Sequence, residues 1–168
     1  MTHRFEALRN DHRLDQFACG KPPLDEWLKQ YARNATGQGT RTYVLLETEK
    51  NSIVGYFAIA PHLVERDEVS PKIGRGAPRQ IPAILLAKLA LDQDSHGSGL
   101  GRLLLVRELE KIIDAAKQAG GKLVVVGALD DEAADFYEHH DFDRVPGDPH
   151  RLLMKISTAA RALDIPWP

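Results

Sequence analysis

Cysteine is nearly absent from this chain of 168 residues, which contains Cys19 alone. One cysteine cannot form a disulfide within the chain, so the sequence indicates a reducing compartment, with Cys19 expected as a buried structural residue rather than a reactive thiol. The chain also lacks a run of about 18 apolar residues, which argues against a membrane-spanning helix. Its beginning, MTHRFEALRN, is charged and has no apolar segment of the kind found in secretory signals. We therefore expect a cytoplasmic protein that does not associate with a membrane.

An excess of basic charge is absent as well. Lys and Arg number 22 against 24 Asp and Glu, for a formal net charge of −2, so net charge does not indicate a nucleic-acid partner. The basic residues are nevertheless clustered in two places. The segment 72–88 has no acidic residue and carries Lys72, Arg75, Arg79 and Lys88, and the segment 21–41 includes Lys29 and Arg33. Two interpretations stay open: a basic surface that attracts an anionic partner, and an ordinary solvated face.

Internal repeats and low-complexity segments are also missing. A hydrophobic content of 43% over this length is enough for one core, so we expect a single domain over residues 1–168. Apolar residues at helical spacing predict an amphipathic helix over 23–35. Segments 40–48 and 52–64 are rich in β-branched and aromatic residues and predict an antiparallel strand pair. The polar segment 65–82 predicts a long surface loop, and the apolar segments 83–92 and 122–129 predict central strands.

Between the two central strands, the chain places glycines at every second position, in His96-Gly97-Ser98-Gly99-Leu100-Gly101. Leucine, isoleucine and alanine then recur at helical spacing until the AGG at 119–121, which predicts one helix. A helix N-terminus carries unpaired N–H groups and partial positive charge, and glycines let an anion approach the backbone closely. The order strand, glycine loop, helix, strand therefore predicts a phosphate-binding loop.

The loop fits neither of two common nucleotide motifs. It lacks the Gly-Lys-Ser/Thr of a P-loop, and Arg102 replaces the third glycine of G-x-G-x-x-G. It resembles the Q/R-x-x-G-x-G/A pyrophosphate loop of the GCN5-related N-acetyltransferases (GNAT), although His96 stands where that family usually has Gln or Arg. The order of expected elements along nearly the whole chain is also similar to that family. The resemblance implies a mixed α/β acyl-CoA N-acyltransferase fold, with a central twisted sheet flanked by helices.

Two further stretches of the sequence point to one subgroup of this family. FACGKPPLDEWLKQYA and DDEAADFYEHHDFDRVPGDPHRLLMKI look like segments of the acetyltransferase toxins of bacterial toxin–antitoxin systems, which acetylate the α-amino group of aminoacyl-tRNA and block translation. Asp141 departs from the family pattern, which has Gly before Phe142, and we expect this to change the helix ending locally. The resemblance implies acetyl-CoA as co-substrate and aminoacyl-tRNA as acceptor. It further implies a small ribbon-helix-helix antitoxin that binds operator DNA, and a homodimer as a candidate assembly.

The same resemblance assigns site residues. It implies that Tyr137 is the catalytic residue, and a tyrosine with a reference pKa of about 10 is protonated at neutral pH and able to donate to a departing thiolate. It implies that acetyl-CoA binds at Leu89, Ala90, Leu91, His96, Gly97, Ser98, Gly99, Leu100, Gly101 and Arg102. Contacts to tRNA are expected from Arg75, Arg79, Lys88, Lys29 and Arg33. A packing role alone is the other interpretation of Tyr137.

Two roles are left unassigned. No general base is named, because an α-amine has a reference pKa of about 7.7–8.0 and is partly neutral at physiological pH. No metal site is expected, because the adjacent His139 and His140 point about 100° apart on a helix and lack partners at ligand spacing. The resulting hypothesis is an acetyl-CoA-dependent N-acetyltransferase toxin acting on aminoacyl-tRNA. The alternatives are an acetyltransferase of a small amine or protein N-terminus, and a non-catalytic acetyl-CoA-binding module.

Overall fold

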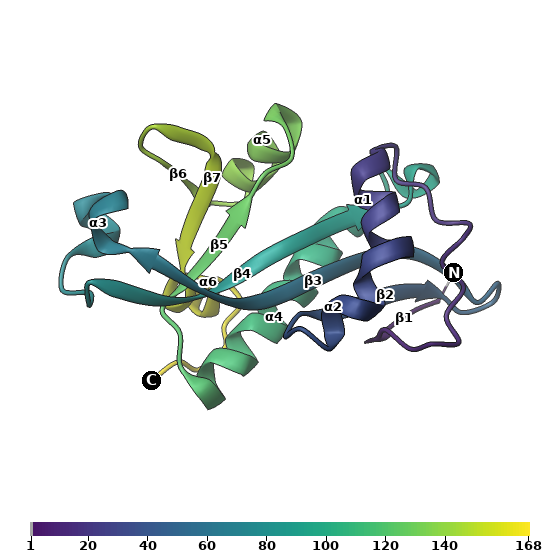
Figure 1. Cartoon of the computed structure of the whole chain (residues 1–168), viewed down its shortest axis with the longest axis horizontal. Helices are drawn as coiled ribbons and strands as arrows, with labels where there is room; N and C mark the ends of the chain where they lie inside the picture. Colours follow the sequence, from purple (N-terminus) through teal and green to yellow (C-terminus); the bar gives the residue numbers. More distant parts are fainter. Residues whose placement is uncertain (1) are drawn as a thin grey trace. The chain divides into compact units, whose positions relative to one another are not determined.

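A computed structural model describes residues 2–168 as a mixed α/β fold (Figure 1). The strands are β1 (His3–Ala7), β2 (Arg41–Glu47), β3 (Ser52–Glu65), β4 (Gln80–Leu91), β5 (Leu123–Gly127), β6 (Asp143–Val145) and β7 (Asp148–Lys155). The α-helices are α1 (Pro22–Glu26), α2 (Ala32–Thr36), α3 (Pro71–Gly74), α4 (Leu100–Ala119), α5 (Asp131–His139) and α6 (Ile156–Ala162). A π-helix, η1 (Trp27–Tyr31), and two 3₁₀ turns, η2 (Arg66–Glu68) and η3 (Gln93–Ser95), complete the set.

The strands of residues 2–168 form one mixed sheet in the order β1-β2-β3-β4-β5-β7-β6. Neighbours are antiparallel at β1–β2, β2–β3, β5–β7 and β6–β7. β4 and β5 are parallel, with Ala83 beside Leu123 and Leu86 beside Val126. Parallel neighbours need a crossover connection, and α4 provides it. The predicted mixed α/β class, with a sheet flanked by helices, is confirmed.

Packing divides the chain into two compact units. The first contains the chain up to Ala60 together with Ala87–Glu108, and the second contains Pro61–Leu86 and Leu109–Pro168. Strands β3 and β4 and helix α4 each contribute to both. The expectation of a single domain over 1–168 stays a prediction.

In the first unit, α1, η1 and α2 follow one another as a continuous helical segment (Figure 1). This confirms the helix expected over 23–35, and the π turn in its middle, where the Ala32 N–H donates to the Trp27 carbonyl, is an additional feature. Leu28 and Ala32 are buried against Val44 and Tyr56 of the sheet. On the other face of β3, a Cβ at Gly55 would lie 3.3 Å from Leu104 Cδ2, so α4 approaches the strand closely.

In the second unit, the segment between β3 and β4 differs from the surface loop expected over 65–82. It contains η2 and α3, and the Arg66 N–H donates to the Arg79 carbonyl over 2.9 Å. Ile73 and Ala77 are buried in a core with residues of β3, β4, β5 and β7. β4 also begins at Gln80 rather than at residue 83. The segment is polar overall and therefore predicts an exposed loop. Burial of the two apolar side chains is nevertheless enough to fix so short a segment.

Strands β1 and β6 and helix α6 were not expected from the sequence. β6 has 3 residues and β1 has 5, which is too short for a period of two to stand out. Helix α6 has 7 residues and no side-chain cap at its start. These elements depend on the neighbours they pair or pack with.

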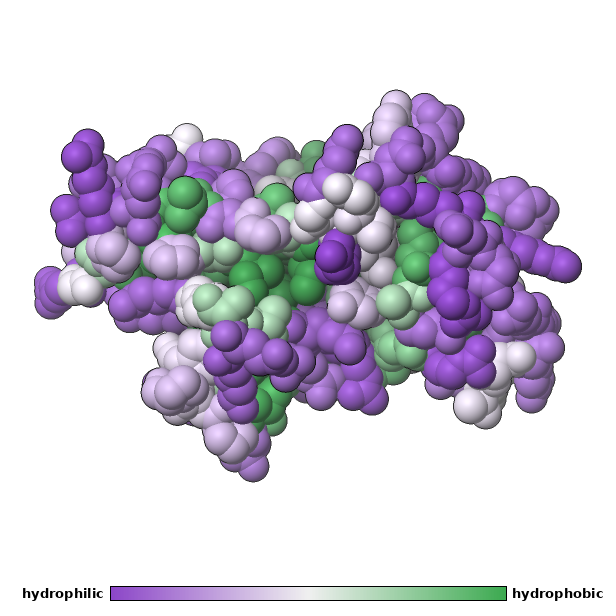
Figure 2. Space-filling view, turned by 60° about the horizontal axis from the view of Figure 1, so that its bottom comes forward, coloured by the Kyte–Doolittle hydropathy of each residue, from purple (hydrophilic) through white to green (hydrophobic). Residues whose placement is uncertain are grey.

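Hydrophilic side chains dominate the face shown in Figure 2, and hydrophobic residues gather there in separate patches. Among the large apolar side chains, Tyr31, Leu63 and Leu129 are exposed. Within residues 2–168, none of the helices combines the length and the apolar character that crossing a membrane would require.

Candidate active site

The glycine loop in the first unit joins the end of β4 to α4. Two backbone bonds fix its start, from the Asp92 N–H to the Val54 carbonyl over 2.8 Å and from the Gln93 N–H to the Ala18 carbonyl over 2.9 Å. His96 Nε2 donates to the Leu91 carbonyl over 2.9 Å, so the ring closes the turn back onto the strand. The unusual His96 therefore has a structural contact of its own.

Two of the loop glycines adopt a left-handed backbone. Gly97 has φ 79° and Gly99 has φ 83°, a region that side chains with a Cβ rarely enter. A Cβ built at either position would meet no heavy atom within 4 Å, so the space beside the backbone is open. Gly101 lies in the first turn of α4. Glycine at positions 97 and 99 thus permits the left-handed backbone and leaves open space beside it.

Ser98 connects the loop to the helix. Its hydroxyl donates to the Ser95 carbonyl and accepts the Leu100 N–H over 3.4 Å. Residues 96–99 are exposed, and α4 continues for 20 residues beyond them. An exposed loop that ends at the N-terminus of a long helix offers N–H groups and partial positive charge to an anion.

Tyr137 lies in the second unit, on the last turns of α5. Asp130 caps this helix by accepting the Ala133 N–H over 2.9 Å. The Tyr137 residue is 5% exposed, and its ring makes edge contacts with Phe136 and Phe142 at centroid distances of 5.3 and 5.5 Å. The ring is therefore held firmly in an aromatic cluster.

The helix that carries Tyr137 ends at His139, and Asp141, two residues further on, has φ 72°. The N–H groups of His140 and Phe142 both donate to the Tyr137 carbonyl, over 3.0 and 3.1 Å. Asp141 thus adopts the left-handed conformation for which glycine is usual. Aspartate tolerates this conformation better than most residues, and the expectation of a changed helix ending stays a prediction.

Arg144 on β6 binds the outer side of the same helix. Its Nε donates to Glu138 over 2.9 Å, its Nη2 to Asp135 over 2.7 Å, and its Nη1 to the Pro149 carbonyl over 3.0 Å. Arg144 was not expected as a functional residue from the sequence. The only signal was two carboxylates three positions apart on one helix face, which many solvated helices also have.

The expected basic residues fall into different surroundings. In the second unit, Arg75 and Arg79 are exposed on the anchored segment between β3 and β4. In the first unit, Lys29 is exposed, while Lys88 Nζ lies 5.6 Å from the centroid of the Trp27 ring.

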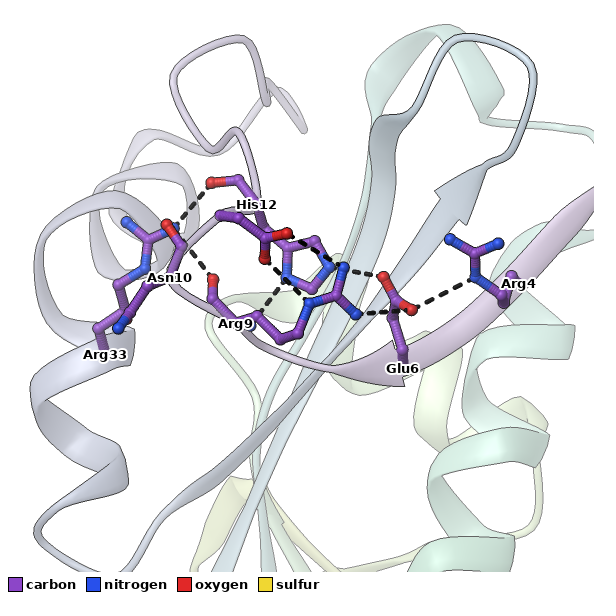
Figure 3. Close-up of polar contacts among 7 residues, drawn as sticks. Arg4, Glu6, Arg9, Asn10, His12 and Arg33 are labelled. Carbon is purple, nitrogen blue, oxygen red and sulfur yellow. Dashed lines mark hydrogen bonds and ion pairs between the residues drawn. The ribbon is translucent and has the colours of Figure 1, made fainter.

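Arg33 binds backbone carbonyls in the first unit. Its Nη2 donates to the carbonyls of Arg9, Asn10 and His12, over 3.2, 3.2 and 2.7 Å (Figure 3). One guanidinium thus holds the turn that follows β1. This nitrogen is therefore occupied by backbone carbonyls.

The remaining candidate side chains have structural explanations. Cys19 is buried as expected, and burial raises the pKa of its thiol to about 11, so it is a poor nucleophile. Its backbone N–H donates to Asp25 over 2.8 Å, which links the cysteine to the start of the helical segment. The His140 ring packs edge-on against Phe136 at 4.8 Å. Between residues 2 and 168 there is no group of three or more His, Cys, Asp or Glu residues able to hold a metal ion.

A model of the acetyltransferase (GNAT) domain matches residues 38–144, a span that includes both the glycine loop and Tyr137. The chain belongs to the GNAT acetyltransferase family. A tRNA-acetylating toxin of Mycobacterium tuberculosis is 36% identical over 151 residues, which are 89% of this chain and 89% of that protein. A probable toxin TacT of Sinorhizobium fredii is 28% identical over 159 residues, which are 89% of this chain and 88% of that protein.

The GNAT fold is also found in a solved structure of similar extent. AtaT complexed with acetyl-methionyl-tRNAfMet has a TM-score of 0.86 at 24% identity, over 96% of this chain and 99% of that chain. At this identity the likeness concerns the fold. It confirms the GNAT architecture expected from the glycine loop and the order of elements.

Proposed function

We propose that this GNAT protein is a toxin that transfers the acetyl group of acetyl-CoA to the α-amino group of aminoacyl-tRNA and so inhibits translation. The observation that carries the proposal is the pair of left-handed glycines, Gly97 and Gly99, opening onto the N-terminus of α4. The 36% identical relative, a tRNA-acetylating toxin, supports the choice of acceptor. Tyr137 on α5 supplies the acid that the reaction needs.

Acetyl-CoA fits the residues of the loop. The open space at Gly97 and Gly99 admits a pyrophosphate, and the helix N-terminus favours its negative charge. The backbone of Leu89, Ala90 and Leu91 binds the acetyl arm, and His96, Ser98, Leu100, Gly101 and Arg102 complete the loop. When bound, acetyl-CoA supplies an acetyl group activated as a thioester.

Tyr137 acts as the general acid. Its hydroxyl gives a proton to the thiolate of coenzyme A as the amine forms the new amide bond and the C–S bond breaks. The amine loses its own proton to solvent, and the Tyr137 phenolate regains one from solvent. The α-amine needs little activation, because its reference pKa of about 7.7–8.0 leaves part of it neutral near pH 7. The exposed Arg75 and Arg79 contact tRNA phosphates, together with Lys29, Lys88 and Arg33.

The activity of the protein is controlled by an antitoxin, as in the toxin–antitoxin systems that the sequence resembles. A small antitoxin of the ribbon-helix-helix class binds the protein and reaches operator DNA, which the toxin itself does not contact. The protein works in the cytoplasm, where charged tRNA is found, and a homodimer is its proposed assembly. Residues 1–168 act as one GNAT domain.

The test measures acetyl transfer from labelled acetyl-CoA to charged tRNA in single-turnover reactions, for the wild type and Tyr137→Phe. Removing a general acid typically costs roughly 10²- to 10⁴-fold in rate, while acetyl-CoA affinity should be unchanged. Transfer to free amino acids or N-terminal peptides, with none to charged tRNA, would favour the small-amine or protein alternative. Acetyl-CoA binding without transfer to any amine would identify a binding module.

A further inference from the structure

Helix α5 is fastened to the β6–β7 hairpin at two places in the second unit. At its first turn, Asp131 Oδ1 lies 2.6 Å from His150 Nε2 of β7. At its last turns, the guanidinium of Arg144 binds Asp135 and Glu138 of the helix and the carbonyl of Pro149, so all three nitrogens of its fork are used. Figure 1 shows α5 beside this hairpin. Arg144 therefore joins the catalytic helix to a strand through one rigid group.

The positions of these contacts bracket Tyr137 along the helix. Asp135 precedes it by two residues and Glu138 follows it directly. At 3.6 residues per turn, Tyr137 leaves the helix about 100° from Glu138 and about 160° from Asp135. The Arg144 contacts thus lie about 100° to 160° around the helix from the tyrosine side chain, where they resist rotation of the helix about its axis.

Stability alone is a weak explanation for this arrangement. The side chains of Asp135 and Glu138 are 73% and 55% exposed, and ion pairs of such exposed groups contribute little to folding. These contacts affect the orientation of helix α5 more strongly than they affect folding stability. A tyrosine oxygen lies on the order of 8 Å from its helix axis, so a rotation of about 10° moves it by roughly 1.4 Å. A displacement near 1 Å can cost on the order of 100-fold in rate.

We propose that Arg144 is a positioning residue that sets the rotation of α5 and thereby aims the Tyr137 hydroxyl. The inference rests on the proposed function, because it takes Tyr137 as the general acid. As a positioning residue, Arg144 contacts neither acetyl-CoA nor the acceptor. It acts only through the tyrosine, so its effect on the rate should depend on the Tyr137 hydroxyl, whereas the effect of a residue that merely supports the fold should not.

A double-mutant cycle tests the proposal. Arg144→Ala is made in the wild type and in Tyr137→Phe, and single-turnover transfer to charged tRNA is measured at saturating acetyl-CoA. If Arg144 works through the tyrosine hydroxyl, the substitution should lower the rate about 10- to 100-fold in the wild type and by less than about twofold in Tyr137→Phe. Arg144→Lys should give an intermediate rate, because one ammonium cannot replace a planar fork with three acceptors.

Arg151→Ala is the matched control. Arg151 lies in the same unit, pairs with Glu68 over 2.7 Å, and has a side chain 22% exposed against 26% for Arg144. It should lower the melting temperature about as much as Arg144→Ala, by about 2–4 °C, and change the transfer rate by less than about twofold. Acetyl-CoA affinity should be the same in all variants.

Two results would overturn the proposal while leaving the proposed function intact. One is an unchanged rate in Arg144→Ala, and the other is an equal reduction of the rate in both backgrounds, which would indicate a structural role. A folded wild type that binds acetyl-CoA but acetylates no charged tRNA would instead reject the proposed function, and the role of Arg144 with it.

Discussion

His12 Nε2 lies 2.7 Å from Glu6 Oε1, and His12 Nδ1 accepts the Arg9 backbone N–H over 2.8 Å (Figure 3). Because Nδ1 accepts, Nε2 carries the proton and donates to the carboxylate. The imidazole is nearly fully buried, with 3% of its side chain exposed. This bond is the main reason that the pKa of Glu6 is lowered from its ordinary value of 4.5, with Arg9 adding to the effect.

The lowered pKa of Glu6 predicts a stability that depends on acidity. A carboxyl whose folded pKa lies below its unfolded pKa stabilises the protein above the unfolded value, and this contribution disappears as the pH falls through the folded value. Glu6→Gln keeps an acceptor for His12 but cannot ionise. It should be less stable than the wild type by roughly 1 kcal/mol at pH 7, and the difference should shrink as the pH falls below the ordinary carboxyl pKa of 4.5. Urea unfolding from pH 3 to 7 measures this, with the exposed Glu26→Gln as control, and a constant difference across the range would contradict it.

Glu108 on α4 predicts the opposite dependence on pH. It is fully buried, its carboxyl oxygens have no hydrogen-bond partner within the described part of the chain, and burial raises its pKa well above the ordinary 4.5. Such a group destabilises the fold as pH rises above the unfolded value, by about 1.4 kcal/mol per pH unit up to the folded pKa. Glu108→Gln should therefore be increasingly more stable than the wild type as the pH rises above the ordinary carboxyl pKa of 4.5. If the free energy of unfolding changed with pH in the same way for both proteins, the Glu108 carboxyl would be ionised in the folded state and the prediction would be wrong.

The glycine loop predicts a selective loss of acetyl-CoA binding. Gly99→Glu places bulk and negative charge where the pyrophosphate is proposed to bind, and should weaken affinity about 100-fold or more. Gly39→Glu is the matched control, because Gly39 lies in the same unit, has φ 100° and also has open space at its Cβ. Calorimetry on the two folded proteins compares them. Equal affinities would remove the loop from the site.

The exposed arginines predict a change in salt dependence. Replacing Arg75 and Arg79 by Glu should weaken tRNA binding and lower the slope of log K against log salt by about 1 for each tRNA phosphate that is no longer bound. Acetyl-CoA affinity should not change. The control reverses Lys117 and Arg161, which have the same charge and lie in the same unit. If both pairs altered the slope equally, the effect would come from net charge rather than from this segment.

The left-handed Asp141 predicts that glycine is better at the end of α5. A non-glycine residue at φ 72° carries strain, so Asp141→Gly should raise stability by up to about 1 kcal/mol. Asp141→Ala should lower it, because alanine has the same strain and no polar side chain to offset it. Thermal unfolding of the three proteins gives the order, and an order with alanine above glycine would refute the argument. The acetyl-transfer rate should be the same in all of them.

Sequence patterns predicted those parts of the fold in which many neighbouring residues agree. The helical segment from Pro22 to Thr36, the strand pair β2–β3 and the strand–loop–helix order around α4 all have long, consistent periodicity. The glycine loop was also readable, because the left-handed conformations of Gly97 and Gly99 depend on local backbone sterics. The tyrosine on α5 was found through its resemblance to a family, since a lone tyrosine on a helix has no chemical signature of its own.

The sequence by itself determined the glycine loop and the order of helices and strands, which follow from local conformational preference. It indicated the mixed α/β class and the GNAT family through the resemblance of its motifs and element order to that family. Only the tertiary structure revealed that Arg144 holds α5, that Arg33 holds the turn after β1, and that Ile73 anchors the segment carrying Arg75 and Arg79. Each of these contacts joins residues that adopt no common periodicity and meet only after the chain has folded. A charged side chain looks the same in sequence whether solvent or three backbone carbonyls surround it, so its role was decided by packing.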